Sequence, residues 1–139
     1  MIKVFDNKTA PAKELANIEK ECFSAPWSEG AFKTAENTLF YVYFINDTAA
    51  GYVGIYSVLD EGYITNIAVK KDYRKNGIAT KLLTKLINDK KDLSFITLEV
   101  RKSNTAAINL YEKFDFKLEG ERKSFYSNPR EDALILTRR

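Results

Sequence analysis

The sequence predicts a single α+β domain over residues 1–139, in which a mixed, mostly antiparallel sheet of about six to seven strands is flanked by about four helices. Three segments rich in β-branched and aromatic residues follow one another between residues 39 and 69, separated only by short polar turns. A helical pattern then lies between two further apolar strands, which implies a right-handed parallel crossover within one sheet. No linker or internal repeat divides the chain, and its length suits one domain.

The first third of the chain is expected to form a short strand and two helices. Residues 2–6 are apolar enough for a strand, and residues 10–23 carry apolar side chains at helical spacing. The segment "SAPWS" then interrupts the helical pattern. Ser28 at its end can cap a second short helix over residues 29–37.

The rest of the chain alternates between strands and helices. "LFYVYFIN", "AAGYVGIYSVL" and "GYITNIAV" are joined by turn-like residues, which favours an antiparallel meander. A helix is expected after Gly77, where apolar residues recur at helical spacing: Ile78, Leu82, Leu83, Leu86 and Ile87. The strand "SFITLEV" precedes the helix "SNTAAINLYEKF", which either Ser103 or Asn104 can cap. Two strands, near "FKLEGER" and at "DALILTR", complete the order.

Missing residue types exclude several kinds of site. The chain contains no histidine, so neither a Ser-His-Asp nor a Cys-His nucleophilic group exists. With no histidine and one cysteine, no zinc site is expected. Cys22 cannot form an internal disulfide, which suits a reducing cytoplasm, and we expect it to act as a small buried apolar residue. A catalytic acid and base must therefore come from Glu, Asp, Tyr, Lys, water or the backbone.

Charge and hydropathy limit the expected partners. No apolar run approaches the roughly 18 residues of a membrane helix, and the N-terminus lacks the apolar core of a secretory signal, so no membrane association is expected. The net charge is +3, but residues 70–91 alone hold eight basic and two acidic residues. An RNA-binding protein without catalysis is therefore an alternative. We do not expect direct nucleic-acid binding, because the apolar face of this segment is committed to the core and its lysines lack interleaved aromatic residues.

A basic loop enters the helix that begins after Gly77. A glycine at this place lets backbone N–H groups approach a ligand closely, and the first helical turn offers unpaired N–H groups and a partial positive charge. Arg74, Lys75 and Lys81 add cationic side chains nearby. The arrangement favours a phosphate or pyrophosphate, although a solvated basic loop with a glycine turn is the alternative on these features alone.

The spacing of this loop resembles a coenzyme motif. Arg-x-x-Gly-x-Ala, preceded by "IAV" and followed by an amphipathic helix, is similar to the acetyl-CoA motif of the GCN5-related N-acetyltransferases (GNAT). The resemblance implies acetyl-CoA as co-substrate and no metal, with strand residues Ile67, Ala68 and Val69 offering backbone hydrogen bonds to the pantetheine arm. It also implies a diphosphate cradle made by seven consecutive residues: Arg74, Lys75, Asn76, Gly77, Ile78, Ala79 and Thr80.

Further segments resemble one branch of this family, the bacterial ribosomal-protein-alanine N-acetyltransferases of the RimI type. They are "CFSAPWSEGAF", "NIAV", "LEVRKSNTAAINLYEKFDF" and "REDALIL", and together they span nearly the whole chain. The resemblance implies transfer of acetyl to the N-terminal α-amino group of a protein, with a ribosomal protein as partner. The alternative is a GNAT enzyme that acetylates another amine, such as a lysine side chain, a polyamine or an antibiotic. Asp115 stands where the family usually has glycine, which affects the turn and leaves the expected chemistry unchanged.

Two residues are implied to be catalytic. From the residues alone, Glu99 near the end of its strand is read as a strand-edge charge paired with Arg101 or Lys102, but the resemblance reverses this, because Glu99 matches the family's proposed general base. Tyr111 matches the expected general acid, with a half-buried amphipathic tyrosine as the alternative. Asn104 matches a residue that hydrogen-bonds the pantetheine arm, and it can also serve as a helix cap.

Acceptor contacts are expected from three places. Trp27, in the corner after the first helix, looks like part of the acceptor groove, or else it is an aromatic plug between two helices. Asp60 and Glu61 lie in a turn and could attract a cationic peptide N-terminus, or they are ordinary solvated turn residues. Tyr126, beside Phe125, matches an aromatic pair that closes the peptide site in the family.

Overall fold

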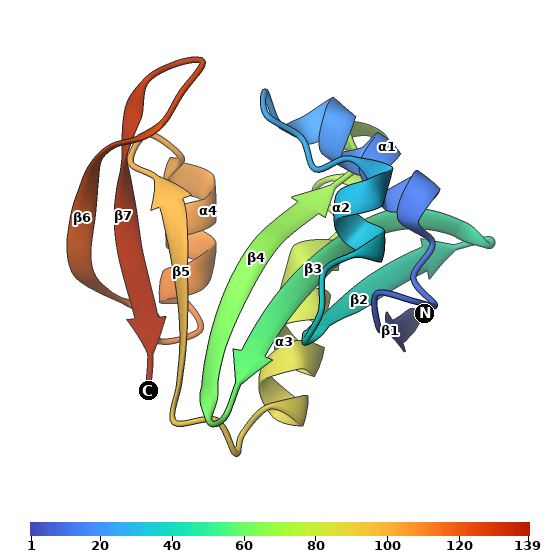
Figure 1. Cartoon of the computed structure of the whole chain (residues 1–139), viewed down its shortest axis with the longest axis horizontal. Helices are drawn as coiled ribbons and strands as arrows, with labels where there is room; N and C mark the ends of the chain where they lie inside the picture. Colours follow the sequence, from blue (N-terminus) through green and yellow to red (C-terminus); the bar gives the residue numbers. More distant parts are fainter.

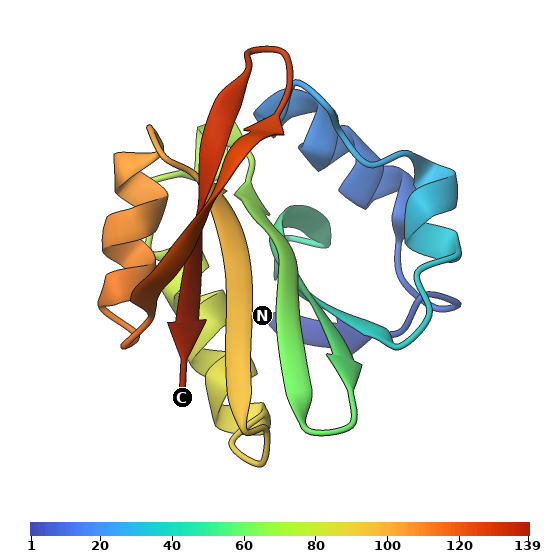
Figure 2. The same ribbon diagram turned by 60° about the vertical axis from the view of Figure 1, so that its left-hand side comes forward.

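The computed structural model describes all 139 residues as one seven-stranded sheet with helices on both faces (Figures 1 and 2). The elements along the chain are β1 (Ile2–Phe5), α1 (Ala12–Cys22), α2 (Glu29–Lys33), β2 (Thr38–Ile45), β3 (Thr48–Val58), β4 (Glu61–Val69), the 3-10 turn η1 (Lys71–Tyr73), α3 (Ile78–Asp89), β5 (Phe95–Arg101), α4 (Thr105–Glu112), β6 (Lys117–Tyr126) and β7 (Glu131–Arg138). The strand order is β1-β2-β3-β4-β5-β7-β6, and only the β4–β5 pair is parallel. The predicted α+β class, with the meander and the crossover, is confirmed.

Two apolar cores hold the helices to the sheet. On one face, α1 and α2 pack on β2 and β3 through a cluster that includes Leu15, Phe32 and Tyr52. On the other face, α3 and α4 pack through a larger cluster that includes Leu82 and Tyr111 (Figure 1). α1 and α2 lie over the β1–β4 half of the sheet, so the same face of β5, β7 and β6 carries no helix (Figure 2).

Strands β4 and β5 separate soon after they begin. Their pairing covers three positions, Glu61–Tyr63 with Phe95–Thr97, and the two ribbons then diverge toward the top of Figure 1. Just beyond the last pair, β4 contains a bulge, because Thr65 and Asn66 together oppose the single residue Gly54 of β3. A Cβ on Gly54 would lie 2.4 Å from the Thr65 hydroxyl oxygen, so any larger residue here would force the Thr65 side chain to move.

Element boundaries differ from the sequence-based expectation in two places. Helix α2 ends at Lys33 rather than at residue 37, where Asn37 has φ 57° and leads into β2. Strand β6 extends as far as Tyr126. The expected Ser28 cap is confirmed, since its hydroxyl accepts the Ala31 N–H at 3.1 Å. None of the helices is both long and apolar enough to cross a membrane.

Candidate active site

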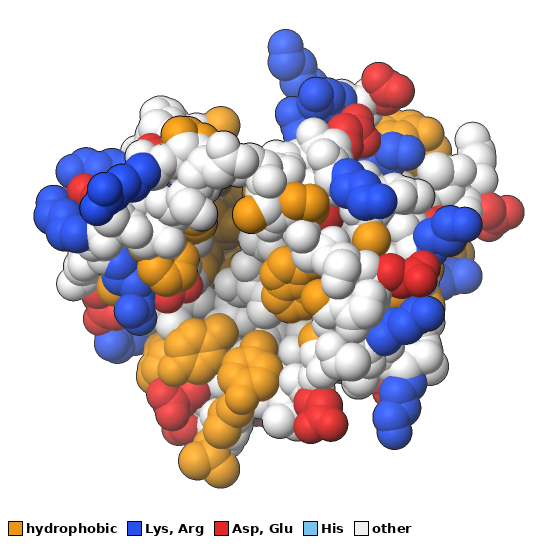
Figure 3. All heavy atoms as spheres, turned by 45° about the horizontal axis from the view of Figure 1, so that its top comes forward, with side chains coloured by type: hydrophobic (Ala, Val, Ile, Leu, Met, Phe, Trp, Pro, Cys, Tyr) orange, Lys and Arg blue, Asp and Glu red, His pale blue; other side chains and the backbone are white.

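The divergence of β4 and β5 opens a cleft of about 600 Å³. Its walls come from the α1–α2 loop, the middle of β4, the end of β5, the start of α4 and the β6–β7 hairpin. Figure 3 shows the surface hollowed here, with apolar side chains around the opening. The polar and aromatic residues that line it include Trp27, Asn66, Glu99, Arg101, Asn104, Tyr111, Phe125, Tyr126 and Glu131. The cleft therefore brings together residues from segments about 100 positions apart in the chain.

The loop before α3 is arranged as an anion site. Its first helical bond is donated by Lys81 to the Gly77 carbonyl, so the N–H groups of residues 75–80 have no acceptor in the chain. Lys75 and Gly77 have φ 67° and 71°, which turns successive N–H groups toward one side. A Cβ on Gly77 would meet nothing within 4 Å, so the space above the loop is open. These donors, at the N-terminus of a 12-residue helix, suit a diphosphate.

The side chain of Arg74 turns away from that loop. Its Nε donates to the Val69 carbonyl at 3.0 Å and its Nη2 to the Cys22 sulfur at 3.3 Å. The Cys22 thiol also donates to the Val69 carbonyl, at 3.4 Å. Burial raises the pKa of Cys22, which is only partly buried rather than fully enclosed as expected. Arg74 thus fixes the end of β4 against α1 in this structure.

The second edge of β4 has no strand partner beyond its bulge, although the Val69 carbonyl accepts hydrogen bonds from Arg74 and Cys22. Ile67, Ala68 and Val69 pair with β3 on one side, whereas the pairing with β5 has already ended at Tyr63. Ile67 lines the cleft at this edge. An extended chain with amide groups, such as a pantetheine arm, can therefore use the unpaired backbone of β4 as a strand partner.

Glu99 lies on the open face of the sheet. Its neighbours Leu98 and Val100 belong to the core beneath α3 and α4, so the alternation of a strand points Glu99 to the opposite face. Its carboxylate forms an ion pair with Arg122 of β6 at 3.3 Å, rather than with Arg101 or Lys102, and it remains partly exposed to the cleft. A carboxylate at this place can accept a proton directly or through a water.

Tyr111 reaches the cleft from the other face. It is 4% exposed, packs against Phe116 at a centroid distance of 5.5 Å, and its hydroxyl makes no hydrogen bond within the chain. Burial, with a smaller contribution from Tyr126, raises the pKa of Tyr111 well above its ordinary value. The phenol therefore stays protonated at neutral pH and is able to donate that proton.

Asn104 begins α4 at the rim of the cleft. Its side-chain oxygen accepts the Ala107 N–H at 3.2 Å, so Asn104 rather than Ser103 is the helix cap. The capping bond uses only the oxygen. The side-chain NH₂ of Asn104 has no partner in the chain and remains available to a ligand in the cleft.

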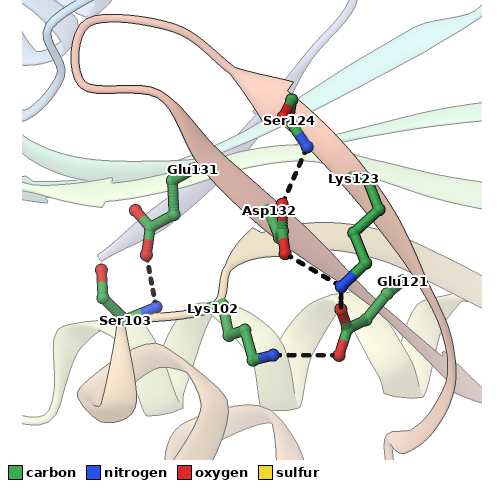
Figure 4. A network of polar contacts seen from close by, with 7 residues as sticks. All are labelled: Lys102, Ser103, Glu121, Lys123, Ser124, Glu131 and Asp132. Carbon is green, nitrogen blue, oxygen red and sulfur yellow. Dashed lines mark hydrogen bonds and ion pairs between the residues drawn. The ribbon is translucent and has the colours of Figure 1, made fainter.

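A polar network fixes the β6–β7 hairpin to the β5–α4 loop. Figure 4 draws its members: Lys102, Ser103, Glu121, Lys123, Ser124, Glu131 and Asp132. The Glu131 carboxylate accepts the Ser103 N–H at 2.7 Å and pairs with Arg101 at 3.2 Å, and its hydrogen bonds to Ser103 lower its pKa. Arg101 in turn lies over the Tyr126 ring, 4.5 Å from its centroid. The network thereby positions the aromatic pair of the hairpin over the cleft.

The expected acceptor residues divide into two groups. Trp27 and Tyr126 line the cleft from opposite sides. The Trp27 ring also packs on Phe32, with 5.2 Å between the ring centroids, so Trp27 borders the cleft and at the same time packs between the two helices. Asp60 and Glu61 do not line the cleft. Asp60 lies in the β3–β4 turn, where it contacts the Ser94 hydroxyl, and Glu61 is the first residue of β4, at the end away from the cleft.

Two residues of the site, Glu19 and Asn66, were not anticipated from the sequence. Glu19 of α1 is fully buried, and its carboxylate accepts hydrogen bonds from the Trp27 N–H (2.9 Å), the Tyr52 hydroxyl (2.6 Å) and the Asn66 side chain. Burial raises the pKa of Glu19, whereas these hydrogen bonds act to lower it. The helical pattern offered one signal: Glu19 follows Leu15 by four positions and so lies on the apolar face of α1.

Comparisons with known proteins agree with this geometry. Residues 12–116 match the model of the acetyltransferase (GNAT) family. A Bacillus subtilis protein provisionally named a ribosomal protein bS18-alanine N-acetyltransferase is 38% identical over 86% of this chain and 83% of its own length. The Escherichia coli K12 protein named [ribosomal protein bS18]-alanine N-acetyltransferase is 37% identical over 86% of this chain and 85% of its own.

Solved structures give the same picture. The crystal structure of the ribosomal-protein-S18-alanine N-acetyltransferase from Escherichia coli superimposes with a TM-score of 0.88 at 34% identity, covering 99% of this chain and 92% of the other. Arabidopsis thaliana NAA60 in complex with a bisubstrate analogue has a TM-score of 0.83 at 18% identity, covering 99% and 97%. The second similarity concerns the fold alone.

Proposed function

The chain belongs to the acetyltransferase (GNAT) family and uses acetyl-CoA, and we propose that its acceptor is the N-terminal α-amino group of a protein, specifically the N-terminal alanine of ribosomal protein bS18. One observation carries the proposed transfer chemistry, and the named relatives support the acceptor. The cleft is bordered by Glu99 on one face of the sheet and by Tyr111 on the other, so a proton acceptor and a proton donor lie on opposite sides of the line where β4 and β5 part.

The coenzyme side is the face of α3 and α4. Residues 75–80 donate backbone N–H groups to the diphosphate, and the charges of Lys75 and the helix terminus attract it. The edge of β4 at Ile67–Val69, where β5 no longer pairs and only the Val69 carbonyl is already bonded, and the side-chain NH₂ of Asn104 hold the pantetheine arm. This places the thioester between the diverging strands, within reach of Tyr111.

The acceptor side is the open face. The amine enters between Trp27 and Tyr126, and Glu99 removes its proton through a water. An α-amino group has a pKa of about 7.7–8.0, so near neutral pH it needs only modest help to lose its proton. The amine nitrogen then bonds to the acetyl carbon as the C–S bond breaks, and Tyr111 gives its proton to the departing sulfur.

Two relatives favour a protein N-terminus over a small amine. Both are named for alanine N-acetylation of bS18, and the similarity extends over 86% of this chain, far beyond the coenzyme loop. A ribosomal protein as acceptor places the proposed activity in the cytoplasm. Acetylation of another amine is the alternative, because the coenzyme loop is the same for every acceptor.

Steady-state kinetics with a set of acceptors tests the proposal. The set is a peptide with the bS18 N-terminus, the same peptide with a blocked α-amine and an internal lysine, and spermidine. We expect kcat/KM for the free N-terminal peptide to exceed the other two by at least about a hundredfold. Equal or higher activity on the blocked peptide or on spermidine would overturn the proposed acceptor.

A further inference from the structure

A carboxamide on the acceptor side of the cleft has a fixed orientation. Asn66 lies in the β4 bulge, and its Nδ2 donates to both oxygens of the Glu19 carboxylate, at 3.4 and 3.2 Å. A carboxylate can only accept hydrogen bonds, so the NH₂ group of Asn66 must face Glu19 and the oxygen Oδ1 must face away from it.

The Oδ1 oxygen of Asn66 is free. It receives no hydrogen bond from the chain, and it is open to solvent, because the one buried side-chain polar atom without a partner is the Thr65 hydroxyl. Asn66 lines the cleft, and its contact with α1 places its side chain on the same face of the sheet as Glu99. Both residues follow shortly after the last β4–β5 pair, Tyr63 with Thr97.

Glu19 excludes the flipped orientation of the Asn66 carboxamide. Its other hydrogen bonds also come from donors, the Trp27 N–H and the Tyr52 hydroxyl, and no acceptor points at it. Glu19 is fully buried, so water does not compete for its oxygens. The network therefore holds the acceptor wall at Trp27 and the Asn66 carboxamide at once.

We propose that Asn66 binds the acceptor amine, its Oδ1 accepting a hydrogen bond from an amine N–H, and that Glu19 is the positioning residue that orients the Asn66 carboxamide. This inference rests on the proposed function for the identity of the amine. The ammonium form of the amine loses a first proton to water held by Glu99, and after the nitrogen has bonded to the acetyl carbon it loses a second proton, which returns through water to the Tyr111 phenolate. The remaining N–H, bound to Asn66, becomes the N–H of the product amide. Asn66 itself exchanges no proton, and its hydrogen bond strengthens as positive charge develops on the nitrogen.

Two variants test the proposal with the bS18 N-terminal peptide. In Asn66→Ala the acceptor oxygen is gone, and kcat/KM for the peptide should fall about ten- to hundredfold, as expected for a lost hydrogen bond to a charged group. In Glu19→Gln the new amide N–H draws the Asn66 oxygen away from the cleft, so a similar loss is expected. Because both act on one oxygen, the double variant should lose no more than the larger single loss.

Binding of acetyl-CoA, measured by titration calorimetry, separates this role from a structural one. We expect its Kd to stay within about twofold of the wild-type value in both variants. Tyr41→Phe is the matched control, because it removes a partly buried hydrogen bond from the Tyr41 hydroxyl to Asp89 (3.0 Å). This bond joins β2 to α3 and lies away from the cleft. It should lower Tm as much as the test variants do while leaving kcat/KM for the peptide unchanged.

Wild-type kcat/KM in Asn66→Ala would overturn the proposal, and so would additive losses in the double variant. If Asn66→Ala does not fold, Asn66→Ser replaces it and is expected to show the same selective loss. The two proposals fail in different ways. Wild-type protein that binds acetyl-CoA but acetylates only spermidine or lysine contradicts the proposed function, and the same variants assayed with that amine still decide the role of Asn66.

Discussion

Glu99 and Tyr111 differ in burial, and burial decides which of them is suited to hold a proton. The phenol of Tyr111 is enclosed and has a raised pKa, whereas Glu99 remains partly exposed beside Arg122. The sequence motif suggested both roles. It could not identify the contact between Glu19 and Asn66, because these residues lie 47 positions apart in the chain. It could not identify the ion pair between Glu99 and Arg122 either, because the placement of β6 near β5 depends on the completed sheet.

Glu99→Gln should reduce kcat by about a hundredfold or more, because general acid–base catalysis contributes about 10²–10⁴ in rate. The fold should be retained, since the partly exposed pair with Arg122 stabilises it by no more than about 1 kcal/mol. Initial rates at saturating peptide and acetyl-CoA check this. Glu112→Gln, an exposed position on α4, is the matched control and should keep full activity. An unimpaired Glu99→Gln enzyme would rule out Glu99 as the base.

Tyr111→Phe should also lower kcat by about a hundredfold or more while leaving the free energy of unfolding nearly unchanged, because the lost hydroxyl has no partner in the chain. The raised pKa adds a pH prediction. The phenol stays protonated through mildly alkaline pH, so wild-type kcat should show no loss from Tyr111 ionisation between about pH 7 and 9. Urea unfolding and a kcat–pH profile measure both effects. A Tyr111→Phe variant with full kcat would refute the assignment.

The β4 bulge is the element that creates the site. It comes where β4 leaves β5, and it turns Asn66 toward α1. Runs of β-branched and aromatic residues between turn-like residues predicted the strand and its neighbours correctly, because such side chains suit a pleated, buried surface. The bulge itself left no such signal, since it depends on the contact between Gly54 and Thr65 across two strands. The α3 loop was more predictable, because a glycine and a helix start are local features.

Gly54→Ala should destabilise the protein by about 1–3 kcal/mol, because the added Cβ would lie 2.4 Å from the Thr65 hydroxyl and 3.2 Å from the Phe40 ring. Displacing the bulge should also lower kcat/KM. Urea denaturation provides the measurement. Gly30→Ala in α2 is the control: its nearest neighbour would be 3.8 Å away, so we expect no destabilisation. Equal stability of Gly54→Ala and wild type would contradict this description of the bulge.

At the scale of the whole molecule, the cleft separates the sheet into a β1–β4 part and a β5–β7 part that pair at only three positions. A ligand that contacts β4, the α3 loop and α4 together therefore adds contacts across the weakest part of the sheet. The order of elements in the sequence predicted the fold class, because the crossover between β4 and β5 has a fixed hand. The extent of the divergence could not be predicted, because no residue pattern in the sequence marks the position at which the β4–β5 pairing ends.

CoA should therefore stabilise the whole domain. At a concentration 100 times its Kd, binding to the folded state alone adds about 2.7 kcal/mol, which raises Tm by several degrees. Thermal unfolding followed by circular dichroism measures this shift. Gly77→Val should show a smaller shift at the same CoA concentration, because φ 71° is unfavourable for a β-branched residue and the loop loses its shape. No shift in the wild-type protein would contradict the assigned coenzyme site.

The most direct measurement uses full-length bS18 with a free N-terminal alanine. The protein is incubated with acetyl-CoA and the purified chain, and fragmentation mass spectrometry then locates the acetyl group. We predict one added acetyl group on the α-amino nitrogen, and none when Glu99→Gln replaces the wild type under the same conditions. Acetyl groups on lysine side chains with a free N-terminus, or unmodified bS18 under conditions in which the enzyme binds acetyl-CoA, would contradict it.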